Sequence, residues 1–152
     1  MPNTFRAALF LLIIFLTPTT LALAQSHSLA STPIRASSAE EESLLTLTAQ
    51  YGRAIATGDL DAMRKFWNPQ SPNLPANLRS YKKVFAQARL ELIGQQVTQL
   101  EITGNKAVSQ LTADERRLDK KTGAILLTFD PFRGACHPFE WIKTSAGWQL
   151  ER

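Results

Sequence analysis

The hydrophobic period of this chain changes once, and this change constrains the fold more than any other feature. Between Ser38 and Ala88, apolar side chains recur at three- and four-residue steps, the period of helices packed against a core. From Leu90 to Glu151 they alternate at two-residue steps, the period of strands with one buried face. Helices followed by antiparallel strands predict an α+β domain, with the helices packed on one face of the sheet.

Capping and turn residues divide the helical half into three helices. Ser38 and Glu41 match a capping box at the start of the first helix, and Gly58 predicts its end. Asp59 predicts the cap of a second, short helix, and a third helix follows a loop at residues 70–73. The helical half should therefore supply three consecutive helices to one face of the sheet.

The strand half is expected to form a meander. Glycine-containing or polar turns at residues 104–106, 121–123 and 145–147 separate successive alternating segments. Asp130 and Pro131 interrupt the alternation, and a proline at that point requires an edge, a bulge or a loop. The pattern indicates antiparallel strands joined by short connections.

The N-terminus has the parts of a secretory signal. Arg6 precedes an apolar run at residues 7–16, and small residues at Ala22 and Ala24 follow it. We predict a signal peptide at 1–24, cleaved after Ala24. An uncleaved membrane anchor is the alternative, because residues 7–24 approach the lower length limit for a span. Pro18 and three threonines inside the segment disfavour that alternative.

Cleavage would leave a lead-in and one domain. Residues 25–39 are rich in serine, threonine and alanine and predict a flexible linker, which precedes a domain at 40–152. The expected location is exported, either periplasmic or secreted, with no membrane attachment after cleavage.

Charge and cysteine content exclude several classes of partner. Seventeen Lys and Arg against thirteen Asp and Glu leave a net charge of +4, with the basic pairs scattered among acids. This dispersion and the export signal argue against nucleic acid as a partner. The single cysteine, Cys136, excludes a multi-thiolate metal centre, and its neighbour His137 would point to the opposite face of a strand. We expect no metal and no cofactor.

One segment carries a family resemblance. Residues 51–63 read Y-G-R-A-I-A-T-G-D-L-D-A-M, Phe66 and Trp67 follow, and the meander ends in a Gly147-Trp148 hairpin. This order resembles the nuclear-transport-factor-2-like superfamily, which includes SnoaL-like proteins and ketosteroid isomerases. It is similar, more narrowly, to short members found in exported bacterial proteins. The resemblance spans 40–152 and implies a curved, cystatin-like sheet around a cone-shaped pocket, and a homodimer formed through the exposed sheet face.

The resemblance to ketosteroid isomerases is incomplete at its central residue. Tyr51 lies seven residues before Gly58, where the resemblance implies a tyrosine that stabilises an enolate oxygen. The general base of those enzymes lies between the second and third helices, but residues 68–81 contain no acid. Proton abstraction requires a base within hydrogen-bond reach. Asp114, Asp130 and Glu140 are the alternative acids, although a charged strand end, a turn and a solvent-facing strand position explain them better.

The aromatic residues allow two interpretations. Their spacing is that of core residues, which is the simpler explanation. Alternatively, some of them line an apolar pocket for a small ligand. The candidate lining residues are Tyr51, Trp67, Phe85, Phe129 and Trp141.

These observations lead to two functional hypotheses. The first is an exported, non-catalytic module that binds a small apolar ligand or a protein partner through a cone-shaped pocket or a sheet face. The second is a cofactor-free isomerase or cyclase-type enzyme in which Tyr51 acts with Asp114 or Asp130.

Overall fold

A computed structural model describes residues 34–129 and 136–152 of the chain. The predicted signal peptide, most of the predicted linker and Asp130 therefore lie outside the described residues. The described residues all fall within one unit, Ser31–Arg152.

Three helices form where the capping residues predict them. They are α1 (Ala39–Thr57), α2 (Leu60–Lys65) and α3 (Leu74–Gln87). Ser38 caps α1 by accepting a hydrogen bond from the backbone N–H of Glu41, at 3.1 Å. The Glu41 carboxylate accepts from the backbone and hydroxyl of Ser37, one residue earlier than a capping box predicts. The start of α1 is confirmed, and only the partner of Glu41 differs.

The break between α1 and α2 depends on two adjacent residues. Gly58 adopts the left-handed conformation, with φ of 70°, and its N–H returns to the carbonyl of Ile55. A glycine ends helices in this way because it has no Cβ to clash. Asp59 then caps α2 by accepting from the backbone N–H groups of Asp61 and Ala62. Both predictions are confirmed.

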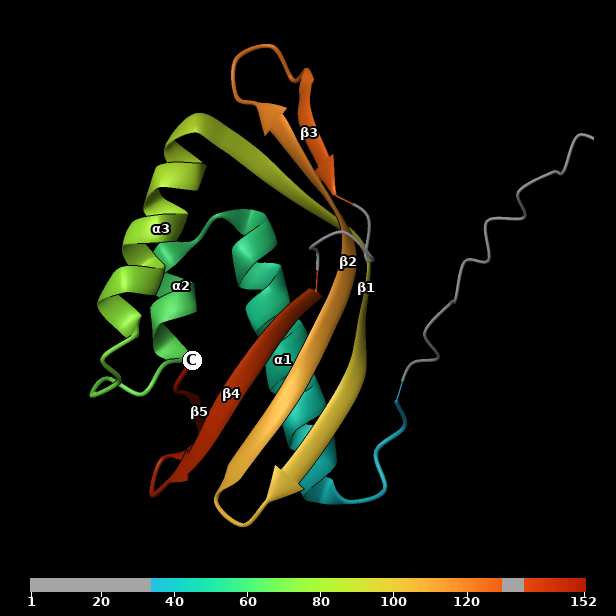
Figure 1. Cartoon of the computed structure of the whole chain (residues 1–152), viewed down its shortest axis with the longest axis vertical. Helices are drawn as coiled ribbons and strands as arrows, with labels where there is room; N and C mark the ends of the chain where they lie inside the picture. Colours follow the sequence, from blue (N-terminus) through green and yellow to red (C-terminus); the bar gives the residue numbers. More distant parts are fainter. Residues whose placement is uncertain (1–33, 130–135) are drawn as a thin grey trace, which may run out of the picture. The chain divides into compact units, whose positions relative to one another are not determined.

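The strands form one antiparallel sheet that curls around α1 (Figure 1). Its members are β1 (Ala88–Thr103), β2 (Lys106–Asp119), β3 (Ile125–Phe129), β4 (Cys136–Thr144) and β5 (Gly147–Leu150). The strand order is β1-β2-β4-β5, and β3 also pairs with β2. Strand β2 pairs with β1 along one side, and with β4 and then β3 along the other. The predicted α+β class is confirmed.

Two strand boundaries differ from the sequence expectation. Strand β1 starts at Ala88, which is also the extended C-cap of α3, so no loop separates the helix from the strand. Strand β4 starts at Cys136, although the alternation of apolar and polar residues resumes only at Phe139. The pairing of β4 with β2 starts at Thr112 and Cys136. Backbone hydrogen bonds between strands do not require alternating apolar side chains, so the strand extends beyond the alternating segment.

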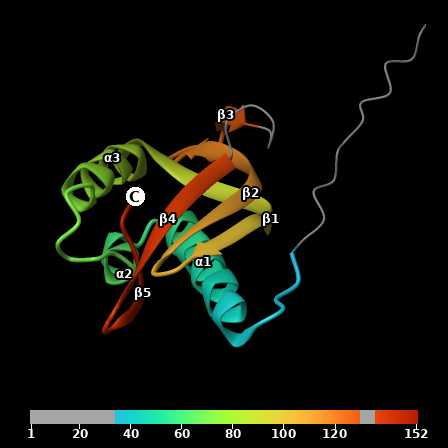
Figure 2. The ribbon, with the colours of Figure 1, turned by 60° about the horizontal axis from the view of Figure 1, so that its bottom comes forward.

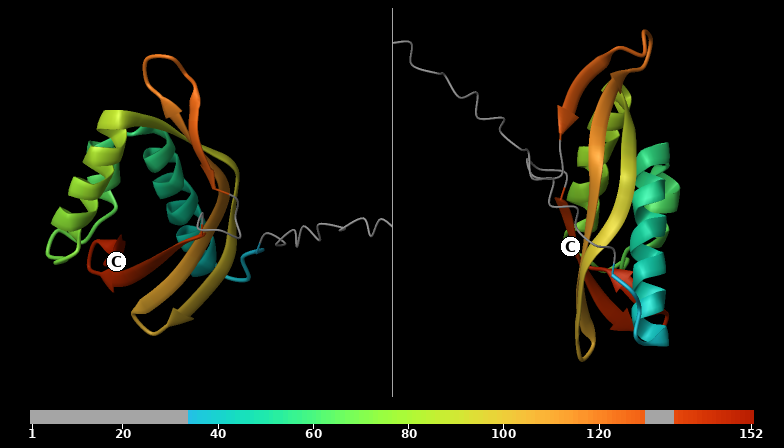
Figure 3. Two further views of the ribbon diagram at one scale, coloured as in Figure 1. Left: turned by 45° about the horizontal axis from the view of Figure 1, so that its top comes forward. Right: turned by 90° about the vertical axis from the view of Figure 1, so that its right-hand side faces the viewer.

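The core lies between α1 and the inner face of the sheet. Helix α1 packs against β1 and β2, and α2 lies between α1 and α3. In the tilted view of Figure 2, α1 runs beneath the curl of the sheet, and the two views of Figure 3 keep it on one face. The largest fully buried side chains are Trp141, Tyr51, Leu44, Ile55, Met63, Leu111 and Leu150.

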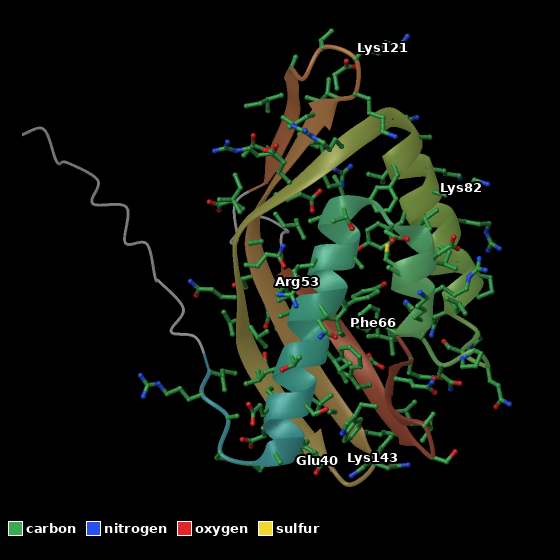
Figure 4. The ribbon with its side chains drawn as sticks, turned by 180° about the vertical axis from the view of Figure 1, so that it is seen from behind. Glu40, Arg53, Phe66, Lys82, Lys121 and Lys143 are labelled. Atoms are coloured by element: carbon green, nitrogen blue, oxygen red, sulfur yellow. The ribbon has the colours of Figure 1, made fainter. Side chains whose placement is uncertain are left out.

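Two contacts fix α1 against the sheet. Glu40, in its first turn, forms an ion pair with Lys143 on β4 (Figure 4). In the middle of α1, a Cβ built on Gly52 would lie 2.6 Å from Cδ2 of Leu111 and from Oε1 of Gln95. Glycine therefore allows the close approach of the helix to β2.

No helix in the described part of the chain is both long enough and apolar enough to cross a membrane.

Candidate functional site

Tyr51 lies in an aromatic cluster beneath the sheet and is 1% exposed. Its ring makes edge contacts with Phe66 at 5.6 Å and with Phe139 at 5.2 Å between centroids. The Tyr51 hydroxyl accepts from Nε1 of Trp67 at 3.0 Å and donates to Oδ1 of Asn77 at 3.3 Å. Its one proton and one of its acceptor positions are therefore committed to protein partners.

Four of the five predicted aromatic lining residues have described side chains, and all four belong to one hydrophobic core cluster. Tyr51 and Trp67 are in direct contact, and both are buried. Trp141 joins them through Phe139, whose ring centroid lies 6.5 Å from that of Trp141, and Nε1 of Trp141 donates to Oγ of Ser109. Phe85 lies on α3 and stacks at 5.5 Å on Tyr81. The Phe129 side chain lies outside the described residues, so a pocket made by all five stays a prediction.

A pocket of about 280 Å³ opens between α3 and β2, which we call the α3 pocket. Helix α3 contributes side chains at three- and four-residue steps, and β2 contributes two at a two-residue step. Its lining residues are Ile55, Asn77, Ser80, Tyr81, Val84, Leu90, Glu115 and Arg117. The pocket adjoins the Tyr51 cluster, because Asn77 lines the pocket and also accepts the hydrogen bond from the Tyr51 hydroxyl.

The acid of this pocket is Glu115, and not one of the predicted acids. Glu115 is 5% exposed, whereas its neighbour Asp114 is exposed to solvent. On β2 the odd-numbered residues from Ala107 to Glu115 face the core, so Asp114 points outward. Asp130 lies outside the described residues. The two-residue period through Leu111 and Ala113 is the sequence signal that could have found Glu115.

Glu115 and Arg117 form an ion pair inside the pocket. Nε of Arg117 donates to Oε1 of Glu115 at 2.9 Å, and the two side chains are 35% and 6% exposed, respectively. Residues two apart on a strand share a face, so β2 itself holds the pair in position. The carboxylate is thus buried beside its own counter-charge, and the guanidinium reaches toward solvent.

Both tyrosines near the pocket stay neutral well above neutral pH. Burial raises the pKa of Tyr51 to about 12, against the opposing hydrogen bond from Trp67. Burial also raises the pKa of Tyr81, and the nearby Tyr51 and Glu115 raise it further while Arg117 lowers it. The Tyr81 hydroxyl makes no hydrogen bond within the part of the chain that the structure describes. It offers a donor to the α3 pocket.

A second cavity, of about 360 Å³, lies where α1 and α3 end. Phe85 and Gly58 form part of its wall, together with Arg89 and Asp119. Arg89 pairs with Glu91 at 3.0 Å, and Asp119 accepts from the backbone of its own turn. Its polar groups serve local structure, so the α3 pocket is the stronger candidate site.

Within residues 34–129 and 136–152, no three His, Cys, Asp or Glu side chains gather in a way that could hold a metal ion. The arrangement offers a carboxylate, a guanidinium and hydroxyl groups beside an apolar wall. These are the components of a site that binds an organic molecule by hydrogen bonds.

Comparison with known proteins identifies the fold. No protein-family model and no curated protein matches the sequence. A nuclear transport factor 2-like superfamily protein from Salmonella enterica serovar Typhimurium is 15% identical, with a TM-score of 0.58 over 76% of this chain and 89% of that one. A ketosteroid isomerase-like protein from Erwinia carotovora atroseptica is 16% identical, with a TM-score of 0.55 over 76% and 94%.

A third structure bears on the shape of the sheet. The protein from Novosphingobium aromaticivorans described as nuclear-transport-factor-2-like with a cystatin-like fold is 16% identical, with a TM-score of 0.52 over 74% of this chain and 78% of that one. Its likeness agrees with the helices and the curled antiparallel sheet found here. The chain therefore has the fold of the nuclear-transport-factor-2-like superfamily.

Proposed function

We propose that this chain is an exported, non-catalytic module that binds a small organic ligand in the α3 pocket. The observation that carries the proposal is the pocket itself, in which Ile55, Val84 and Leu90 form an apolar wall beside the Glu115–Arg117 pair. Small-ligand sites combine an apolar lining with a few polar groups in this way. The positive start, apolar run and small residues of the N-terminus support export to the periplasm or outside the cell.

The state of the polar groups favours binding over catalysis. A general base must reach a substrate proton, and Arg117 holds the Glu115 carboxylate at 2.9 Å. An oxyanion stabiliser must direct its proton at the substrate, and the Tyr51 hydroxyl directs its proton at Asn77. The Tyr51 hydroxyl has only one proton, so it would have to exchange its acceptor before it could stabilise a substrate oxygen.

A cofactor-free isomerase or cyclase-type enzyme is the second candidate. The observation in its favour is that a buried carboxylate, Glu115, and a neutral phenol, Tyr81, line one pocket. In this version the strand acid is Glu115, in place of Asp114 or Asp130, and Tyr81 acts in addition to Tyr51. If a substrate is found, turnover that is unchanged in Tyr51→Phe, Tyr81→Phe and Glu115→Gln would exclude this candidate.

Native mass spectrometry of the purified chain tests the binding function. We expect the wild type to retain a small compound, and Ser80→Trp to lose it, because Ser80 lies at the exposed rim of the pocket. Gln87→Trp is the matched control, since it adds the same side chain at an exposed position of α3 that does not line the pocket. Retention that is equal in wild type and Ser80→Trp would contradict the α3 pocket as the site.

A further inference from the structure

We propose that the hairpin of β2 and β3 binds reversibly to the surface of an anionic phospholipid bilayer. Ile125, Leu126 and Leu127 on β3 would enter the boundary between headgroups and acyl chains, and Lys120 and Lys121 in the preceding turn would contact lipid phosphates. In Figure 1 this hairpin projects past the end of α3, so a flat surface can reach it. The proposal goes beyond ligand binding and revises the sequence expectation of no membrane contact after cleavage.

The apolar side chains of β3 are the most exposed large hydrophobic side chains in the described part of the chain. Ile125, Leu126 and Leu127 are 59%, 57% and 42% exposed, respectively. Leu127 lies opposite Arg117 and Ile125 lies opposite Leu118, so Leu126 is the extra residue where the register of β3 shifts. An extra residue of this kind redirects side chains. The three apolar side chains are therefore not divided between a buried face and a solvent face.

Strand β3 lacks the residues that usually protect the edge of a sheet. Within residues 34–129 and 136–152, it pairs with β2 alone. Natural edge strands carry charged side chains or proline, which prevent other chains from adding to the edge. The β3 sequence I-L-L-T-F contains neither. Contiguous exposed apolar side chains of this kind mark a surface that contacts another apolar layer.

A bilayer matches this surface better than a second copy of the chain does. The five residues of β3 extend about 17 Å, so two copies paired through it would bury far less than the roughly 800 Å² per partner of a stable interface. A bilayer sets no such minimum. Binding to its surface increases with the apolar area that is buried and with the attraction of cations to anionic lipids.

Basic residues lie beside the apolar edge. Lys120 and Lys121 occupy exposed positions in the turn that joins β2 to β3. The acid next to them is Asp119, whose Oδ1 accepts from the backbone N–H groups of Lys121 and Thr122. The carboxylate is thus bound to its own turn, whereas the two ammonium groups extend from flexible, exposed side chains. Such groups can reach lipid phosphates.

Helix α3 extends the basic surface. Lys82 and Lys83 are exposed on α3, and no Asp or Glu occurs from residue 62 to residue 90. The end of α3 and the β2–β3 turn line the same cavity of about 360 Å³, so both lie at one end of the molecule. Figure 4 shows Lys121 at the outer end of the hairpin and Lys82 on the outer side of α3. Each lysine close to an anionic bilayer raises the affinity about five-fold.

Flotation with lipid vesicles tests the proposal. All 152 residues are expressed in an exporting bacterial host, and the intact mass identifies the N-terminus of the purified chain. The chain is mixed with vesicles of phosphatidylcholine, or with vesicles of phosphatidylcholine and phosphatidylglycerol in equal parts. We expect it to float with the anionic vesicles and not with the neutral ones. Binding should weaken as salt is added, because salt screens exposed charges.

Two sets of variants separate the apolar contribution from the electrostatic one. Leu126→Ser should weaken binding to the anionic vesicles about five- to ten-fold, whereas Leu126→Met keeps an apolar side chain of similar size and should bind like the wild type. Lys120→Gln combined with Lys121→Gln should weaken binding at least about ten-fold. Lys65→Gln combined with Lys106→Gln is the matched control, because it removes the same charge at exposed positions of α2 and of the opposite end of β2.

A tryptophan placed on the hairpin reports the contact directly. The native Trp67, Trp141 and Trp148 are 4%, 1% and 9% exposed, so their emission should change little when vesicles are added. The emission of Leu126→Trp should shift to shorter wavelength with the anionic vesicles and should be quenched by brominated acyl chains. Gln50→Trp is the matched control, since it adds the same side chain at an exposed position of α1, and it should show neither effect.

Three results would overturn the proposal: a wild type that does not float with the anionic vesicles, equal flotation with neutral ones, or variants of Leu126, Lys120 and Lys121 that all bind like the wild type. If Leu126→Ser is unfolded by circular dichroism, the emission of Leu126→Trp decides. Absent flotation together with altered sedimentation of Leu126→Ser would show that β3 contacts a second copy instead. Retention of a compound in the α3 pocket is measured separately, so the two proposals can fail independently.

Discussion

Nε1 of Trp141 on β4 donates a hydrogen bond to Oγ of Ser109 on β2, at 2.8 Å. Ser109 Oγ lies 2.8 Å from Oγ1 of Thr48, which itself donates to the carbonyl of Leu44 at 2.7 Å. Each hydroxyl has one proton, so Ser109 must be the donor to Thr48. A directed chain of hydrogen bonds thus runs from the sheet to α1 through a region in which Thr48, Ser109 and Trp141 are at most 1% exposed.

Ser109→Ala should destabilise the domain by about 1–3 kcal/mol, because Nε1 of Trp141 would be buried without an acceptor. Urea unfolding followed by circular dichroism measures the change. Ser145→Ala, at an exposed turn position, is the control and should change stability by less than about 0.5 kcal/mol. Equal effects of the two substitutions would show that the chain of hydrogen bonds contributes nothing.

Tyr51→Phe tests the second buried contact of this kind. Trp67 is 4% exposed, and its Nε1 would lose the Tyr51 hydroxyl, so we expect a loss of about 1–3 kcal/mol in the free energy of unfolding. Tyr81→Phe removes a hydroxyl without a hydrogen-bond partner in the described ranges and should cost less. Trp67→Phe removes the indole N–H that Tyr51→Phe would leave without an acceptor, so the two substitutions together should cost less than the sum of their separate effects. A Tyr51→Phe variant as stable as the wild type would refute this role.

Alkaline pH should destabilise the fold through its tyrosines. The chain has two tyrosines, and the pKa of each is raised above the ordinary value of 10.0, that of Tyr51 to about 12. The unfolded chain therefore loses these protons first, so their contribution is complete below pH 10 and declines as pH rises toward the folded values. The slope should be about 1.4 kcal/mol per pH unit for each tyrosine in that window.

The ultraviolet absorbance of tyrosinate checks this directly. The folded chain should show little tyrosinate at pH 10, where the unfolded chain in urea is half ionised. Tyr51→Phe should reduce the steepness of the stability loss above pH 10. Tyrosinate absorbance that rises with the same midpoint in folded and unfolded chains would contradict the prediction.

Gly52→Ala tests whether the gain in helix propensity or the cost of overpacking has the larger effect on the free energy of unfolding. Alanine in a helix is favoured over glycine by about 1 kcal/mol, but overpacking a core costs about 1–3 kcal/mol. The new Cβ would lie 2.6 Å from Leu111, which is 1% exposed and cannot move freely, so we expect net destabilisation in urea unfolding. The control Gln50→Ala lies on the exposed side of α1. If Gly52→Ala is more stable than the wild type, α1 does not approach the sheet this closely.

The outer face of the sheet leads to a prediction about assembly. Ile93 and Val108 are 41% and 38% exposed on strands whose other face is buried. We expect the purified chain to form a homodimer through this face, and Val108→Lys to shift sedimentation toward the monomer. Gln50→Lys is the control, because it adds the same charge at an exposed position of α1, away from the outer face of the sheet. Sedimentation of the wild type as a monomer at high concentration would rule out the dimer.

Local chemistry made most of the fold predictable. Ser38, Gly58 and Asp59 act on backbone groups within four residues, so their roles could be inferred from the sequence. The acid of the pocket could not be chosen in the same way. Asp114 and Glu115 are adjacent acids in one charged run, and only the face of β2 that meets α1 distinguishes them.

Long-range partners account for the rest of the site. The Tyr51 hydroxyl satisfies Trp67 and Asn77, which are sixteen and twenty-six residues away in the sequence. A tyrosine at that helical position predicts burial but gives no indication of which polar atoms will meet it. The ion pair of Glu115 with Arg117 is local, but its burial depends on α3 lying across it.

The inward face of β2 carries both Ser109, in the buried chain of hydrogen bonds, and Glu115, in the pocket. A slip of one residue in the pairing of β2 would turn every second side chain to the opposite face. Asp114 would then enter the interior, and Ser109 and Glu115 would leave it together. A molecule with a misaligned sheet would thus lose its central polar contacts and its ligand site together. The fraction of molecules that bind the ligand would therefore equal the fraction whose sheet is correctly aligned.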